Sequence, residues 1–147
     1  MNSRPGRILA LDLGTRRIGL ALSDGLGITA QGLETLLRRN KRADLAAIAN
    51  IVRERQVELI LVGLPLRMSG EAGTQAEWAR EFAAVLEQYC GVPVTLRDER
   101  LTSVEAERAL RGSGVPQDQR KAAIDRLSAT ILLQSYLDSL AAAGAQS

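Results

Sequence analysis

The sequence predicts an α/β protein with a mixed five-stranded sheet and helices packed against it. Near the N-terminus, three short apolar runs are joined by tight turns, which is typical of antiparallel strands that follow one another. Further along, helical segments alternate with two more apolar runs, which is the pattern of parallel β-α-β units with right-handed crossovers. A length of 147 residues favours a single domain spanning 1–147, with its core over about 7–140.

The antiparallel part is expected to contain strands at 7–12, 18–23 and 29–36. The first run is apolar and ends just before Gly14, which suits a buried strand followed by a turn. The dipeptide Asp24-Gly25 is a strong turn signal after the second run. We expect residues 1–6, which come before the first strand, to be frayed.

The remaining elements follow from the change of apolar period. A helical stripe predicts a helix at 43–56, and a second stripe predicts one at 74–89 that ends at Gly91. Pro93 suits the first residue of a strand or an edge strand. The full set of expected elements in this half is a helix at 43–56, strands at 58–63 and 92–98, helices at 74–89 and about 118–140, a short helix from Thr102, and a frayed end at 141–147.

The composition excludes several classes of catalyst. The chain has no histidine and a single cysteine, Cys90, so the usual zinc sites, serine–histidine triads and cysteine–histidine dyads are ruled out. Catalysis would have to use carboxylates, Lys or Arg, hydroxyls or oxygen-bound metals. The lone cysteine favours a cytoplasmic protein, and no run of apolar residues is long enough to span a membrane.

The positive charge is carried almost entirely by arginine, since Lys41 and Lys121 are the only lysines. Arginine binds phosphate through two parallel hydrogen bonds, and the pI of about 9.1 suits a polyanionic partner. A bias of the source genome would give the same composition. Aromatic residues make up 3% of the chain, which argues against a module that stacks bases on its surface.

Acidic residues stand where the predicted strands end. Asp12 ends the first strand, and Asp98 and Glu99 follow the last one. Asp125 lies within the final helix on a stripe of small and apolar residues. Because ligand sites in open sheets lie beyond the carboxyl ends of parallel strands, these acids can converge there. Carboxylates without histidine suit Mg²⁺ or Mn²⁺, and two such ions can promote in-line phosphodiester hydrolysis.

Each acid also has a purely structural interpretation. Asp12 can cap a turn, and the pair that follows the last strand can be solvated. Asp125 can form an ion pair with Lys121 or Arg126.

Basic residues accompany the acids. They would hold a nucleic-acid backbone across the metals, or they are ordinary solvated charges. The candidates for nucleic-acid binding are Arg16, Arg17, Arg67, Arg100 and Lys121.

Four motifs in order resemble the YqgF/RuvX family over about 7–140. They lie at 11–24, 62–70, 98–102 and 124–138, beginning with Leu11-Asp12-Leu13-Gly14-Thr15 and including Asp98-Glu99-Arg100-Leu101-Thr102. The resemblance implies a ribonuclease H-like fold related to the RuvC resolvases. It also implies a nuclease that either resolves Holliday junctions or matures the 5′ end of pre-16S rRNA. The acidic positions of the family correspond to Asp12, Glu99 and Asp125.

The middle carboxylate has two candidates. In ribonuclease H-like sheets the first strand is central, and Glu99 follows a strand two spacings away, or roughly 9.6 Å. Asp98 is the reserve metal ligand, because adjacent strand residues point to opposite faces.

Two other functions compete with a nuclease. One is a nucleic-acid-binding protein on the same fold without catalysis. The other is an actin-like phosphotransferase, since the segment from Asp12 to Gly19 also resembles a phosphate loop of such enzymes; the chain has room for only one of the two domains they use. Symmetric junction cleavage would require a twofold dimer, whereas processing of one rRNA end would not.

Overall fold

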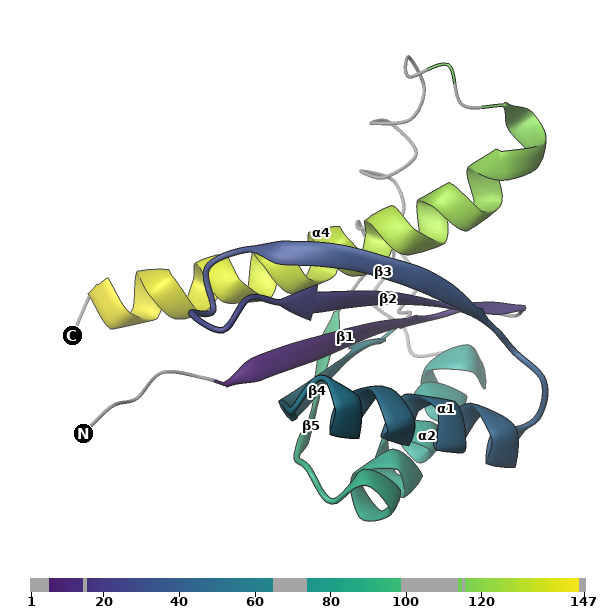
Figure 1. The fold of residues 1–147 in the computed structure, drawn as a ribbon, viewed down its shortest axis with the longest axis horizontal. Coiled ribbons are helices and arrows are strands. Elements are labelled where there is room, and N and C mark those ends of the chain that lie inside the picture. Colours follow the sequence, from purple (N-terminus) through teal and green to yellow (C-terminus); the bar gives the residue numbers. More distant parts are fainter. Residues whose placement is uncertain (1–5, 15, 65–73, 99–113, 115, 146–147) are drawn as a thin grey trace.

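The computed structural model describes residues 6–14, 16–64, 74–98, 114 and 116–145. The described strands form one mixed sheet in the order β3-β2-β1-β4-β5, which confirms the predicted arrangement. β1 pairs antiparallel with β2 and parallel with β4, so it lies at the centre (Figure 1). The strands are β1 (Arg7–Leu13), β2 (Arg17–Ser23), β3 (Ala30–Leu37), β4 (Val57–Leu64) and β5 (Val94–Asp98).

Helices cover both faces of the sheet (Figure 1). α1 (Lys41–Glu54) and α2 (Thr74–Cys90) pack on one face, and α4 (Gln117–Ala145) packs on the other. The predicted short helix from Thr102 lies outside the described residues. No helix in the described ranges is both long and apolar enough to cross a bilayer.

Strand alternation divides the core into two apolar clusters. Leu9, Leu11 and Leu13 of β1 belong to the cluster beneath α1 and α2. Ile8 and Ala10, at the intervening positions, belong to the cluster beneath α4. The period of two therefore shows which face each residue of the central strand occupies, and this places the candidate site.

The ends of several elements follow from local chemistry. The Asn40 side chain accepts a hydrogen bond from the Ala43 backbone N–H at 2.8 Å and caps α1. β5 begins at Val94 rather than at residue 92, directly after Pro93, whose carbonyl accepts a hydrogen bond from Ile60.

The last helix extends further than expected, since the sequence predicted that it would end at about residue 140. α4 continues through 141–143 to Ala145. These three residues are alanines, which have the highest intrinsic helix propensity, so they extend the helix beyond its last contacts with the sheet.

Candidate active site

Asp12 is a carboxylate in an otherwise apolar strand. Its side chain lies on the α4 face, two residues after Ala10, and the residue is only 8% exposed. It stands one residue before the end of β1 and pairs with Gly19 of β2. The central strand therefore presents a nearly buried acid at its carboxyl end.

α4 runs antiparallel to β1 and brings its N-terminal half toward the same end of the sheet (Figure 1). The Gln134 side chain bonds to the backbone of Ile28 and Ala30, at the start of β3. Arg126, two turns earlier in α4, lies against Gly32 and lines a cavity near the end of β3. The neighbouring residue, Asp125, is thus on the part of α4 that approaches the edge where β1 ends.

Several predicted site residues lie outside the described part of the chain. These are Glu99, Arg67 and Arg100, together with the side chains of Asp125 and Lys121. Within the described ranges, no three His, Cys, Asp or Glu side chains are grouped so as to hold a metal. The convergence of the three acids stays a prediction.

Asp98 ends β5 on the face opposite Asp12. It pairs with Leu64 of β4, and side-by-side partners in a parallel ladder point the same way. Leu64 belongs to the apolar cluster beneath α1 and α2. The sheet therefore lies between the Asp98 side chain and the Asp12 side chain.

The turn that follows Asp12 is closed by its own backbone. The Gly14 N–H donates to the Arg17 carbonyl at 2.8 Å. A Cβ on Gly14 would lie 2.7 Å from that carbonyl oxygen, closer than real Cβ contacts come. Glycine is therefore required for this tight connection between β1 and β2.

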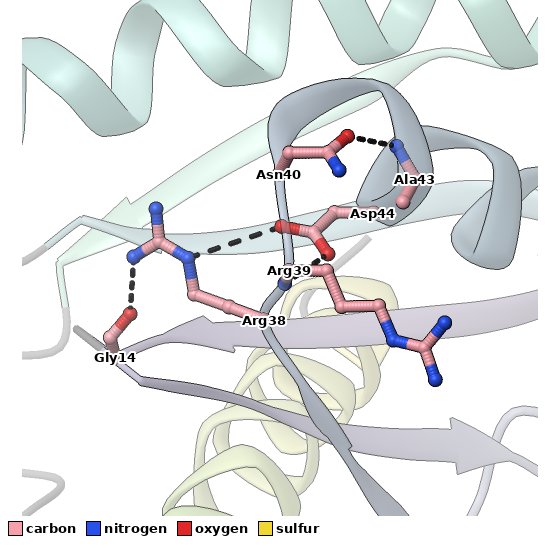
Figure 2. Close-up of polar contacts among 6 residues, drawn as sticks. All are labelled: Gly14, Arg38, Arg39, Asn40, Ala43 and Asp44. Carbon is pink, nitrogen blue, oxygen red and sulfur yellow. Dashed lines mark hydrogen bonds and ion pairs between the residues drawn. The ribbon is translucent and has the colours of Figure 1, made fainter.

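Arg38 ties both sides of this turn to the end of β3. Its Nη1 donates to the Gly14 carbonyl at 2.6 Å, and its backbone N–H donates to the Arg16 carbonyl at 2.8 Å. Figure 2 shows the guanidinium between Gly14 and Asp44. The Arg38 Nε lies 4.0 Å from Asp44 Oδ2.

Arg38 also contacts α1 and α2, the two helices that pack on the same face of the sheet. Asp44, in the first turn of α1, is 4% exposed, and its Oδ1 accepts the Arg39 N–H at 3.1 Å. The Arg38 Cζ lies 4.2 Å from the centroid of the Trp78 ring, and Trp78 stacks on Phe82 in α2. The loop beside Asp12 is thus fixed to α1 and α2 by one side chain.

Sequence reasoning did not identify Arg38 or Asp44. The Trp78 ring packs against Phe82 and beneath the Arg38 guanidinium. An acid in the first turn of a capped helix is an ordinary feature. Nothing in the local pattern indicates that Asp44 meets an arginine at the end of the preceding strand.

Of the predicted basic residues, two are described next to this turn. Arg16 is exposed, and Arg17 opens β2 and is partly buried. Arg17 shares a cavity with Arg126, a residue that was considered only as a partner of Asp125. The described site therefore combines a nearly buried carboxylate, a hydrogen-bonded turn and adjacent guanidinium groups.

Comparisons of the sequence with known proteins identify a matching family model and close relatives. The family model described as "RuvX: Holliday junction resolvase" matches residues 6–139. A curated protein of Koribacter versatilis (strain Ellin345), named "Putative pre-16S rRNA nuclease", is 59% identical over 133 residues, covering 90% of this chain and 87% of that protein. A protein of the same name from Syntrophus aciditrophicus (strain SB) is 50% identical over 134 residues, covering 91% and 89%.

Two kinds of solved structure share the fold. T. thermophilus RuvC, in complex with a Holliday junction substrate, matches with a TM-score of 0.59 and 16% identity, covering 93% of this chain and 96% of that one. The fowlpox virus Holliday junction resolvase matches with a TM-score of 0.52 and 12% identity, covering 91% and 99%. These similarities confirm the expected ribonuclease H-like fold.

Proposed function

The chain belongs to the RuvX family, and on this premise we propose that it is a divalent-metal-dependent endonuclease that hydrolyses phosphodiester bonds of structured nucleic acid. One observation carries the proposal. The Asp12 carboxylate lies nearly buried at the carboxyl end of the central strand, on the face of the sheet that α4 covers. The same helix, α4, bears Asp125. A carboxylate in this position is suited to bind a metal ion at the carboxyl ends of the strands.

The proposed metal ligands are Asp12, Glu99 and Asp125. The register of β5 supports Glu99 over the reserve candidate Asp98, because Asp98 is on the other face of the sheet from Asp12. All three proposed ligands are carboxylates, and a donor set made only of oxygen favours Mg²⁺ or Mn²⁺. When bound, two such ions would lower the pKa of the attacking water and stabilise the leaving oxygen.

The chain's own residues would prepare this chemistry in two ways. The turn from Gly14 to Arg17, held by Arg38, would fix the backbone directly after Asp12 and limit the movement of its carboxylate. Arg16 and Arg17, with Arg67, Arg100 and Lys121 as further candidates, would bind phosphates on either side of the cut.

The 5′ end of pre-16S rRNA is the preferred substrate. Relatives at 59% and 50% identity are named "Putative pre-16S rRNA nuclease". The four-way DNA junction is the second candidate, supported by the description of the family model. A junction resolvase would act as a twofold dimer to make paired cuts. Either substrate, together with the lone Cys90, fits a location in the cytoplasm.

Cleavage assays on both substrates test the proposal. Wild-type protein and the variants Asp12→Asn, Glu99→Gln and Asp125→Asn would be compared with Mg²⁺, with Mn²⁺ and with chelator. We expect each variant to lose at least about a hundredfold in rate, because each removes a ligand charge. Asp98→Asn is the matched control and should retain activity.

Two results would overturn the proposed mechanism: cleavage that persists in Asp12→Asn, or cleavage that persists in chelator. Steeply salt-dependent binding without turnover under any metal would instead support a nucleic-acid-binding protein on this fold. Tight ATP binding measured by calorimetry would support the phosphotransferase alternative.

A further inference from the structure

A groove of about 210 Å³ lies between the end of β3 and α4. We call it the β3–α4 groove and define it by its lining residues Arg17, Glu34, Thr35, Leu37 and Arg126. Two of these five side chains are guanidinium groups and one is a carboxylate. The groove therefore carries a net positive charge beside the candidate active site.

The groove lies at β3, two strands or roughly 9.6 Å from the strand that bears Asp12. Asp12 pairs with Gly19 of β2. The β2–β3 ladder shifts register between Ile18 and Leu20, so Gly19 faces the bulged segment 34–35 of β3. Because Gly19 has no side chain, β2 places nothing between the Asp12 carboxylate and the groove.

The two guanidinium groups are available for a ligand. Within the described ranges, the side chains of Arg17 and Arg126 make no ion pair and no hydrogen bond. Other arginines are engaged: Arg53 donates to Asn50, and Arg97 donates to Ser135. The Glu34 carboxylate lines the same groove but is not within ion-pair distance of either guanidinium.

The path of the Arg126 side chain depends on a glycine in β3. A Cβ on Gly32 would lie 2.9 Å from Arg126 Cγ and 3.0 Å from Thr130 Oγ1. Because Gly32 has no Cβ, the aliphatic part of the Arg126 side chain can lie directly against β3 near the groove. Gly32 thus accounts for how an exposed arginine of α4 reaches the end of β3.

The Thr35 hydroxyl is an unpaired polar group in the wall of the groove. Its Oγ1 is buried and makes no hydrogen bond in the protein. Buried polar atoms in native proteins nearly always have partners, so an unpaired hydroxyl in the lining of a cationic groove needs an explanation.

We propose that the β3–α4 groove binds a phosphate of the nucleic-acid backbone next to the bond cut at Asp12, with Arg17 and Arg126 as its cationic ligands. The inference rests on the proposed nuclease function and adds to it the path of the substrate strand across the α4 face. Arginine binds phosphate through paired hydrogen bonds that do not depend on base identity. The groove would therefore serve RNA and DNA substrates alike.

Binding measured in chelator tests the groove separately from cleavage. Fluorescence anisotropy would follow two labelled probes, an RNA stem carrying the 5′ precursor of 16S rRNA and a four-way DNA junction. Arg126→Gln should weaken binding by roughly tenfold and reduce the slope of log K against log salt by about one. Glu34→Gln should tighten binding, because it removes a negative charge that faces the phosphate.

Arg80→Gln is the matched control, because Arg80 is an exposed arginine of α2 on the opposite face of the sheet. It removes the same charge and should leave binding within about twofold of wild type. Arg17→Gln provides a second test within the groove, should Arg126→Gln perturb the fold as seen by circular dichroism.

The outcomes separate the groove from the proposed function. If wild-type protein binds and cuts either probe while Arg17→Gln and Arg126→Gln bind no worse than Arg80→Gln, the groove assignment is wrong and the nuclease stands. If wild-type protein neither binds nor cuts either probe, both are wrong. A charge-ordered series, tightest for Glu34→Gln and weakest for Arg126→Gln on one or both probes, supports the groove.

Discussion

Arg38 donates a hydrogen bond of 2.6 Å from its Nη1 to the carbonyl oxygen of Gly14, two residues after Asp12. The same guanidinium lies over the Trp78 ring and near the buried Asp44 carboxylate. One side chain at the end of β3 therefore links the turn beside the candidate active site to both helices on the far face of the sheet.

Arg38→Ala should lower the free energy of unfolding by about 2 kcal/mol, because it leaves the Asp44 carboxylate without its cation and the Gly14 carbonyl without its donor. Cleavage should fall further than this loss of stability explains. Arg38→Lys should recover only part of both, since an ammonium cannot make the flat, forked contacts of a guanidinium. Urea unfolding and initial cleavage rates measure the two effects.

The control for Arg38 is its neighbour. Arg39 is exposed and uses only its backbone N–H in this cluster. Arg39→Ala should therefore change stability by less than about 0.5 kcal/mol. Equal effects at positions 38 and 39 would contradict a specific role for Arg38.

Gly14→Ala should destabilise the protein by about 1–3 kcal/mol, because the new Cβ would overlap the Arg17 carbonyl oxygen and open the turn. Gly25→Ala is the matched control: a Cβ there meets nothing within 4 Å, and its φ is not positive. Thermal unfolding followed by circular dichroism gives both values. A Gly14→Ala protein as stable as Gly25→Ala would show that the turn tolerates a side chain.

Asp24 predicts a pH dependence of stability. The Ile28 backbone N–H, bonded to Asp24 Oδ1 at 2.8 Å, holds the pKa of this carboxyl below its usual 3.8. The stability that the carboxylate adds to the folded protein is therefore complete above pH 3.8. It is lost as the pH falls from there through the lower pKa of Asp24 in the folded state. Urea unfolding of wild type and Asp24→Asn should show a difference at pH 7 that shrinks below pH 3.8. A difference that does not change with pH would exclude this cause.

Cys90 should react slowly. Burial raises the pKa of its thiol above the usual 9.0, so less thiolate is present at neutral pH than in a free cysteine. Modification by a disulfide reagent should be slower in the native protein than in the protein unfolded in guanidinium. Equal rates in the two states would show that the thiol is accessible and unperturbed.

Local patterns in the sequence predicted most of the sheet. Short apolar runs and the Asp24-Gly25 turn gave the antiparallel strands, and the helical stripes gave α1 and α2 to within two residues. The start of β5 was predicted two residues too early, at residue 92, whereas the strand begins directly after Pro93. The C-terminal end of α4 was missed because fraying was assigned from position in the chain, whereas the alanines at 141–143 favour helix.

The candidate site divides in the same way. Asp12 was found because a charged residue in an apolar strand breaks a local pattern. Arg38 and Asp44 were not found, because their contact depends on the connection between β3 and α1 and on the position of Trp78 in α2. The cavity shared by Arg17 and Arg126 depends on Gly32 lying beneath α4, which is a contact between distant segments.

The stacking of Arg38 on Trp78 gives the molecule an intrinsic optical probe. Trp78 is the single tryptophan of the chain, and its ring centroid lies 4.2 Å from the Arg38 Cζ. When tryptophan is excited selectively, the emission of the protein therefore comes from the one residue that contacts Arg38, which holds the turn after Asp12. A change in emission on adding Mg²⁺ or a nucleic acid would report movement of that turn, with no dye attached and no substitution made.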